Sequence, residues 1–263
     1  MKLAVQENLV PGKNLAEKLP KIEGYGFEGV ELWGSNELGE KNKEIKGAIS
    51  TSRVKVSSIC AGYPGDLMGS ERRVRQEAME GIKQRLTWAA ELGATGVIVV
   101  PTFGEPKISD LAPLYSKVEE VEKRLLIEQC KVLGKHAADV GSIVLIEPLN
   151  RYETHLLRKL EDAVSICKEV RSDHVKIMAD FFHMSIEERN IPESIEAAGA
   201  YIAHIHLADS TRELPGYGHT DFKGGFSALK KIGFTRFMAL ECSVPGPQEI
   251  ELPKCAKYLK KCM

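Results

Sequence analysis

The chain has 263 residues, of which 43% are hydrophobic and 28% are charged, a composition typical of a globular protein with a large core. Its 36 basic residues almost balance its 37 acidic ones, and this net charge of −1 argues against attraction to DNA or to an acidic membrane surface. No apolar stretch is long enough to span a bilayer, and the polar residues at positions 6–8 interrupt the apolar N-terminus. We therefore expect no signal peptide and a cytoplasmic location.

Strand-like and helix-like segments alternate from one end of the chain to the other. Short segments rich in Val and Ile predict eight strands, at residues 2–6, 29–33, 54–60, 96–100, 143–148, 175–180, 202–209 and 237–242. The clearest helical patterns cover residues 71–92, 113–140, 160–170, 191–199, 226–232 and 249–260. Ser109 and Asp110 indicate the start of the second of these helices.

The alternation of elements favours one particular α/β architecture. The predicted strands are nearly all apolar, which is typical of a parallel sheet covered on both faces. Gly93, Gly141, Gly199 and Gly233 each follow a helix and precede a strand, as a helix-ending glycine does. Eight strand–helix pairs with no break in composition predict a single domain over residues 1–263, closed as a (β/α)₈ TIM barrel.

Four potential metal ligands lie at the ends of four successive predicted strands. They are Glu147, Asp180, His206 and Glu241, spaced about 30 residues apart, which is the length of one strand–helix unit. All four side chains should then point into the mouth where barrel enzymes bind substrate. Three carboxylates and one imidazole suit Mn²⁺, Mg²⁺ or Co²⁺. Of the neighbouring His204 and His206, we expect only one to face into the barrel.

The two glutamates of this set could also act as an acid/base pair. Glu147 and Glu241 follow the fifth and eighth strands and could face each other across a bound substrate. One would remove a proton from carbon while the other returns a proton from the opposite side, with a metal stabilising the enediolate between these steps. That chemistry inverts a stereocentre next to a ketone.

Further polar and aromatic residues fall near the same mouth. Glu153, His183 and Arg212 follow the fifth, sixth and seventh strands and could contact a substrate. Trp33 and Phe103, after the second and fourth strands, could wall a sugar pocket.

The cysteines and the basic residues give weaker indications. The six cysteines form no CxxC pair and predict reduced thiols, although Cys60 and Cys242 fall at strand ends near the mouth. The segment 71–85, with five basic residues, predicts a solvated helix face without a function.

Several segments resemble a known family. EPLNRYETH, ADFFHM, HIHLADSTRELPGYGHTDF and the strand ending in LEC resemble the sugar phosphate isomerase/epimerase superfamily, the xylose isomerase-like TIM barrels, over the whole chain. The motifs are most similar to those of ketose 3-epimerases, such as the D-tagatose and D-psicose (allulose) 3-epimerases. The resemblance implies one Mn²⁺ or similar ion on Glu147, Asp180, His206 and Glu241, with both glutamates catalytic. It also implies substrate contacts by Glu153, His183, Arg212 and Cys60.

Other activities on the same scaffold stay open. The GHTDF segment looks more like relatives acting on other small polyols and keto sugars, so an aldose–ketose isomerase, a hydroxypyruvate isomerase or an inosose dehydratase are alternatives, and the substrate could be phosphorylated. A DNA-repair role like that of apurinic endonuclease IV needs histidines where this chain has Glu31, Cys60 and Val100. We therefore expect a small sugar as partner, no nucleic acid or membrane, and, from the resemblance, a dimer or tetramer.

Overall fold

Eight parallel strands form a closed barrel in the computed structural model, which describes residues 1–263. Each strand pairs with the next along the chain, and the first pairs with the last through the partners Lys2 and Phe237. The predicted α/β barrel and all eight strands are confirmed. The strands are β1 (Lys2–Gln6), β2 (Gly29–Trp33), β3 (Lys55–Cys60), β4 (Val97–Val99), β5 (Val144–Ile146), β6 (Val175–Asp180), β7 (Ile202–Leu207) and β8 (Phe237–Leu240).

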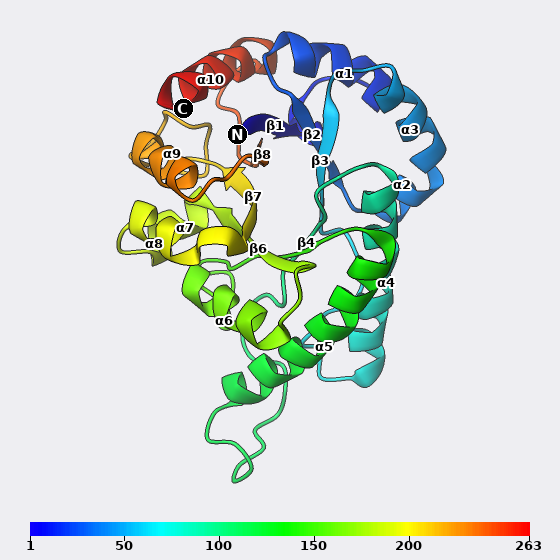
Figure 1. The fold of residues 1–263 in the computed structure, drawn as a ribbon, viewed down its shortest axis with the longest axis vertical. Helices are drawn as coiled ribbons and strands as arrows, with labels where there is room; N and C mark the ends of the chain where they lie inside the picture. Colours follow the sequence, from blue (N-terminus) through cyan, green and yellow to red (C-terminus); the bar gives the residue numbers. More distant parts are fainter.

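A ring of helices surrounds the barrel, and the last helix lies beside the first so that the ring closes (Figure 1). Two short 3₁₀ helices, η1 (Glu7–Leu9) and η2 (Gly199–Tyr201), adjoin β1 and β7. The α-helices are α1 (Leu15–Gly24), α2 (Asn36–Glu40), α3 (Asn42–Ser50), α4 (Arg72–Glu91), α5 (Val118–Val140), α6 (Leu160–Val170), α7 (Phe181–Glu187), α8 (Ile191–Ala198), α9 (Phe222–Lys231) and α10 (Gln248–Cys262). No helix is both long and apolar enough to cross a membrane.

The core has two parts because the strands bury both of their faces. A cluster of 60 buried residues joins the outer faces of the strands to the helices. A second cluster takes one residue from each of β3 to β7, namely Cys60, Ile98, Leu145, Met178 and Ala203. Polar side chains occupy the barrel at the carboxyl ends of the strands, so a functional site is expected at that end.

The helix boundaries confirm most of the sequence predictions and correct two helix starts. One is the start of α9, which begins at Phe222, four residues before the predicted start at 226. Gly93, Gly141, Gly199 and Gly233 all have a positive φ, from 53° to 78°, which agrees with their expected place after helices. The start of α5 was predicted wrongly. Ser109 and Asp110 lie in an exposed loop, and α5 begins only at Val118. That loop projects from the ring before α5 in Figure 1.

Candidate active site

The four predicted metal ligands meet at the C-terminal end of the barrel. Asp180 ends β6, His206 lies in β7, and Glu147 and Glu241 directly follow β5 and β8. One ligand atom from each of the four residues lies within 4.8 Å of the others. Parallel strands of a barrel end at one rim, which is why residues so far apart in the chain converge here.

The ring of His206 offers a free nitrogen to this cluster. Its Nδ1 lies 3.0 Å from Glu241 Oε2, 3.7 Å from Glu147 Oε1 and 3.8 Å from Asp180 Oδ2. Nevertheless Nδ1 is buried and makes no hydrogen bond, which is costly for a polar atom. A buried imidazole nitrogen aimed at three carboxylates fits a divalent cation with a preference for oxygen ligands and tolerance for nitrogen.

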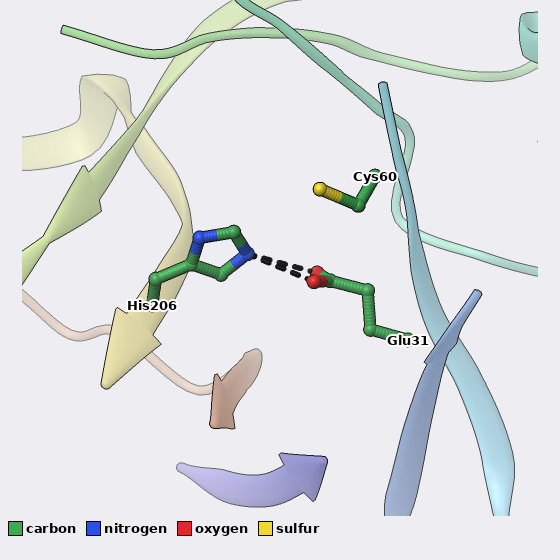
Figure 2. A group of neighbouring side chains, drawn as sticks. All are labelled: Glu31, Cys60 and His206. Carbon is green, nitrogen blue, oxygen red and sulfur yellow. Dashed lines mark hydrogen bonds and ion pairs between the residues drawn. The ribbon is translucent and has the colours of Figure 1, made fainter. Parts of the chain in front are cut away.

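Glu31, in the middle of β2, fixes the orientation of that ring. The carboxylate is fully buried and lies 2.9 Å from His206 Nε2, with the other ring nitrogen turned away from it (Figure 2). It lies 2.9 Å from His204 Nε2 and also accepts hydrogen bonds from Ser58 Oγ at 2.6 Å and Gln6 Nε2 at 2.9 Å. A His206 ring whose Nε2 donates to Glu31 has its Nδ1 lone pair free for a metal.

The contact of His204 with Glu31 corrects one prediction. His204 and His206 both face the barrel interior, because residues two apart on a strand point to the same side. The expectation that only one of them does so was wrong. His204 serves Glu31 rather than the four ligands.

Arg212 lies against two of the four ligands. Its guanidinium donates to Asp180 Oδ2 at 2.6 Å and to Glu241 Oε2, and it packs over the ring of Phe182 at 4.7 Å. The fork of a guanidinium suits both carboxylates and sugar hydroxyls. Arg212 therefore lies where it would meet a substrate bound at the cluster.

His183 and Glu153 lie on the β5 and β6 side of the cluster. His183 Nδ1 accepts from the backbone N–H of Asn150 at 3.2 Å, so Nε2 carries the proton. That Nε2 lies 3.7 Å from Asp180 Oδ2 and 3.9 Å from Glu147 Oε1. The side chain of Asn150 donates to Glu153 Oε1 at 2.8 Å. Asn150, which the sequence analysis did not single out, thus positions both groups.

The surroundings shift the pKa values of Glu147 and Glu241 in opposite directions. Burial raises the pKa of Glu147 well above its usual value, and the negative charges of Glu241 and Asp180 add to this. Burial also acts to raise the pKa of Glu241, but the charges of His206 and Arg212 outweigh it and lower that pKa. The two carboxyl groups therefore differ in their affinity for a proton.

Cys60 lies beside the cluster but is nearly inaccessible. Its Sγ is 3.8 Å from Glu241 Oε1, and only 4% of the residue is exposed. Burial, and next the charge of Glu31, raise the pKa of the thiol well above its ordinary value, so the sulfur stays protonated. In Figure 2 it points towards the space between Glu31 and His206.

The basic segment 71–85 differs from its prediction at Arg85. Arg85 is 1% exposed and donates from Nε to Gly34 O at 2.6 Å and from Nη2 to Gly62 O at 2.9 Å. It therefore ties the loops after β2 and β3 to α4 instead of forming part of a solvated face. Sequence periodicity could not show this, because the partners are backbone carbonyls of other loops.

The chain is similar to known sugar epimerases. A family model described as a xylose isomerase-like TIM barrel matches residues 19–262. The chain is 31% identical over 242 residues to 3-dehydro-D-guloside 4-epimerase of Escherichia coli K12, covering 92% of each protein. It is 36% identical over 115 residues to a D-psicose 3-epimerase of Enterocloster bolteae, covering 44% of this chain and 38% of that protein.

Solved structures give the same result. The apo form of 3-keto-D-glucoside 4-epimerase from E. coli superposes with a TM-score of 0.91 at 28% identity, covering 100% of both chains. These relatives confirm the predicted enzyme class, an epimerase, and the resemblance found in the sequence. The chain belongs to the xylose isomerase-like TIM barrel family.

Proposed function

We propose that this protein is a metal-dependent sugar epimerase that inverts a carbon next to a ketone, with Glu147 and Glu241 as the acid/base pair. The observation that carries the proposal is the convergence of these two carboxylates with Asp180 and the free Nδ1 of His206. Relatives named as epimerases, one of them matched over nearly its whole length, support the same reaction type.

The four ligands would hold one divalent ion, and we propose Mn²⁺. When bound, such an ion supplies Lewis-acid stabilisation of negative charge on the oxygens next to the reacting carbon. In this proposal Asp180 binds only the ion and takes no part in proton transfer. Burial acts to lower the pKa of Arg212, but the negative charges of Asp180 and Glu241 outweigh it and raise that pKa above its ordinary value, so Arg212 stays positively charged beside the substrate.

The two glutamates divide the proton transfers. Inversion needs proton removal from one face of the carbon and proton return to the other, so two groups on opposite sides are better placed than one. Glu147 approaches from β5 and Glu241 from β8. His183, with its proton on Nε2, and Arg212 would donate hydrogen bonds to sugar oxygens and hold the carbon between the carboxyl groups.

Two positions on the sugar fit this chemistry. Inversion at C3 of a ketose through a cis-enediolate is the reaction that the sequence motifs imply. Inversion at C4 of a 3-dehydro sugar is the second candidate, favoured by the relative that matches 92% of its own length. Both reactions abstract a proton from the carbon beside a carbonyl, so the same residues serve either one.

A solvent-label experiment tests the proposal. With Mn²⁺ in D₂O, the enzyme should place deuterium at C3 of a 2-ketose or at C4 of a 3-dehydro sugar, detected by NMR. Glu147→Gln and Glu241→Gln should each lower the rate of labelling by about 100-fold or more, as for loss of a general acid or base. Isomerisation of an aldose to a ketose without a change at C3 or C4 would instead indicate an aldose–ketose isomerase.

A further inference from the structure

A cavity of about 390 Å³ opens directly beside the four metal ligands, on the side of β1 to β3. We call it the Trp33 cavity; its lining includes Gln6, Glu7, Glu31, Trp33, Lys41 and Cys60. Gln6 connects it to the reaction site, because Gln6 Nε2 donates to both Glu31 Oε1 and Glu241 Oε1 at 2.9 Å. One end of the cavity therefore adjoins a proposed catalytic carboxylate.

The substrate-holding groups come from the opposite part of the barrel rim. His183, Arg212 and Glu153 follow β6, β7 and β5, whereas the Trp33 cavity is built by β1, β2, β3 and the helices α1 and α2. A sugar held by those three groups over the ligands would not occupy this cavity. A substituent on that sugar could reach into it. Cavities of this size are typical of small-molecule sites.

Both ammonium groups that line the cavity already have hydrogen-bond partners within the protein. The ammonium group of Lys41 lies 3.0 Å from Glu37 Oε2, and that of Lys18 donates to the backbone oxygen of Glu7 at 2.9 Å. A site for a phosphate group offers cations or backbone N–H groups that lack protein partners. This lining instead suits an uncharged ligand with several hydroxyl groups.

Trp33 supplies a fixed apolar surface at the rim of the cavity. The side chain is 54% exposed, which is unusual for so large an apolar residue beside a reaction site. The backbone on both sides is held: Trp33 N donates to Glu7 Oε1 at 3.4 Å, and Arg85 binds the carbonyl of Gly34. A Cβ at Gly34 would lie 2.0 Å from the carbonyl oxygen of Ala61, so the loops after β2 and β3 pack in close contact.

From these three features we infer that the substrate is a glycoside whose keto sugar lies over the metal ligands. The group linked to its anomeric carbon, here called the aglycone, binds in the Trp33 cavity; this group is an uncharged second sugar ring that stacks on the indole. The inference rests on the proposed epimerase function and narrows its substrate class to glycosides. The full-length relative, named for a guloside, is consistent with it. A rigid aromatic surface and a polar rim lower the cost of ordering the site when the ring binds.

The first test compares a large and a small aglycone. For the 3-keto form of a β-linked glucose disaccharide, Trp33→Ala should lower kcat/KM by roughly tenfold, mainly through KM, as for loss of one aromatic contact. For the 3-keto methyl glucoside the same variant should be unchanged, and Trp33→Phe should restore most of the activity on the disaccharide. Phe237→Ala, an aromatic lining a cavity at the opposite end of the barrel, is the matched control. Equal losses on both substrates, or no loss on the disaccharide, would overturn the inference.

The second test measures binding without turnover as the readout. The chain has two tryptophans, so Trp88→Phe leaves Trp33 as the only indole reporter. The keto disaccharide should quench its fluorescence saturably, and the methyl glucoside should not. Quenching without epimerisation of any keto sugar would refute the proposed function and support the cavity as a glycoside site. Epimerisation of sugars without quenching by the disaccharide would leave the function standing and refute the aglycone site.

Discussion

The carboxylate of Glu31 determines which nitrogen of His206 is available to a metal. Four donors from Gln6, Ser58, His204 and His206 surround it in the barrel interior. Burial acts to raise the pKa of Glu31, but the charges and hydrogen bonds of His206 and His204 outweigh it and hold that pKa well below its usual value. An ionised Glu31 accepts from all four groups at once, which a neutral side chain of the same shape cannot do.

Glu31→Gln should therefore weaken metal binding although Glu31 is not itself one of the four ligands. The amide presents two N–H donors towards groups that are donors, so the His206 ring loses its fixed orientation. We expect the affinity for Mn²⁺ to fall by about 10–100-fold, as for other partners of metal-binding histidines. Competition with a chromophoric chelator measures this. Ser58→Ala, which removes a different hydrogen bond to the same carboxylate, is the control and should have a smaller effect.

Arg212 should matter for turnover and not for metal retention. Arg212→Ala removes a fixed positive charge beside Asp180 and Glu241, and we expect kcat/KM to fall by about 100-fold or more, as for loss of a charge-stabilising donor. Metal affinity should stay the same or rise, since the two carboxylates lose a competing cation. Arg212→Lys should recover only part of the activity because it lacks the guanidinium fork. Loss of metal from Arg212→Ala would contradict this assignment.

At the scale of elements, a buried pair holds the loop that carries Glu153. His155 Nε2 lies 2.5 Å from Glu122 Oε2 on α5, and its Nδ1 lies 2.7 Å from Gly104 O in the loop after β4. The N–H of Gly104 in turn donates to the backbone oxygen of Glu153 at 2.7 Å. These hydrogen bonds join the loops after β4 and β5 to each other and to α5.

His155→Ala should destabilise the protein because it leaves the fully buried Glu122 carboxylate without a partner. We expect a loss of about 3 kcal/mol in the free energy of unfolding, measured by urea denaturation. The double variant Glu122→Leu/His155→Leu removes both polar groups and should recover most of that loss. A double variant as unstable as the single one would show that the pair is not the cause.

The sequence predicted the elements better than their ends. The eight strands and the helix after most of them follow from alternating apolar patterns, and glycines marked several helix ends. The predicted start of α5 was wrong because Ser109 and Asp110 have the residue types of a helix start but lie in a loop, nine and eight residues before Val118. Four helices, α1, α2, α3 and α7, are absent from the predicted ones. Of these, α2 and α7 have only five and seven residues, too few to show a helical period.

At the scale of the whole molecule, the metal should be part of the stability of the fold. The four proposed ligands, carried by or directly after β5, β6, β7 and β8, come together only when the barrel is closed. At an Mn²⁺ concentration about 100 times the dissociation constant, binding stabilises the folded state by about 2.7 kcal/mol. The Tm should rise by roughly 5–10 °C for a protein of this size.

Thermal unfolding with Mn²⁺ and with a chelator checks this expectation. Asp180→Asn should abolish most of the difference in Tm between the two conditions, since an amide binds the ion more weakly than a carboxylate. Asp180 suits this test because we propose no role for it in proton transfer. An equal Tm of the wild-type protein with and without the ion, at a concentration that supports activity, would argue against a structural contribution.

The closed barrel also explains which residues of the site could be predicted from the sequence and which could not. The meeting of Glu147, Asp180, His206 and Glu241 was predictable because each lies at or next to a strand end, and all strand ends of a parallel barrel share one rim. The roles of Glu31, Gln6 and Asn150 were not, since each depends on partners from distant strands that meet only when the ring closes. Local pattern carries no information on which strands lie across from each other.

The side chains that would perform the reaction come from residues 147–241, whereas the Trp33 cavity comes from residues 6–60. Gln6, Glu31 and Cys60 line the Trp33 cavity and also contact Glu241 or His206. Variation within the segment 33–41 could therefore redirect such a barrel to a new glycoside while the inversion chemistry stays intact. Grafting that short segment between relatives is a direct route to epimerases with altered preference, and natural divergence has the same route open to it.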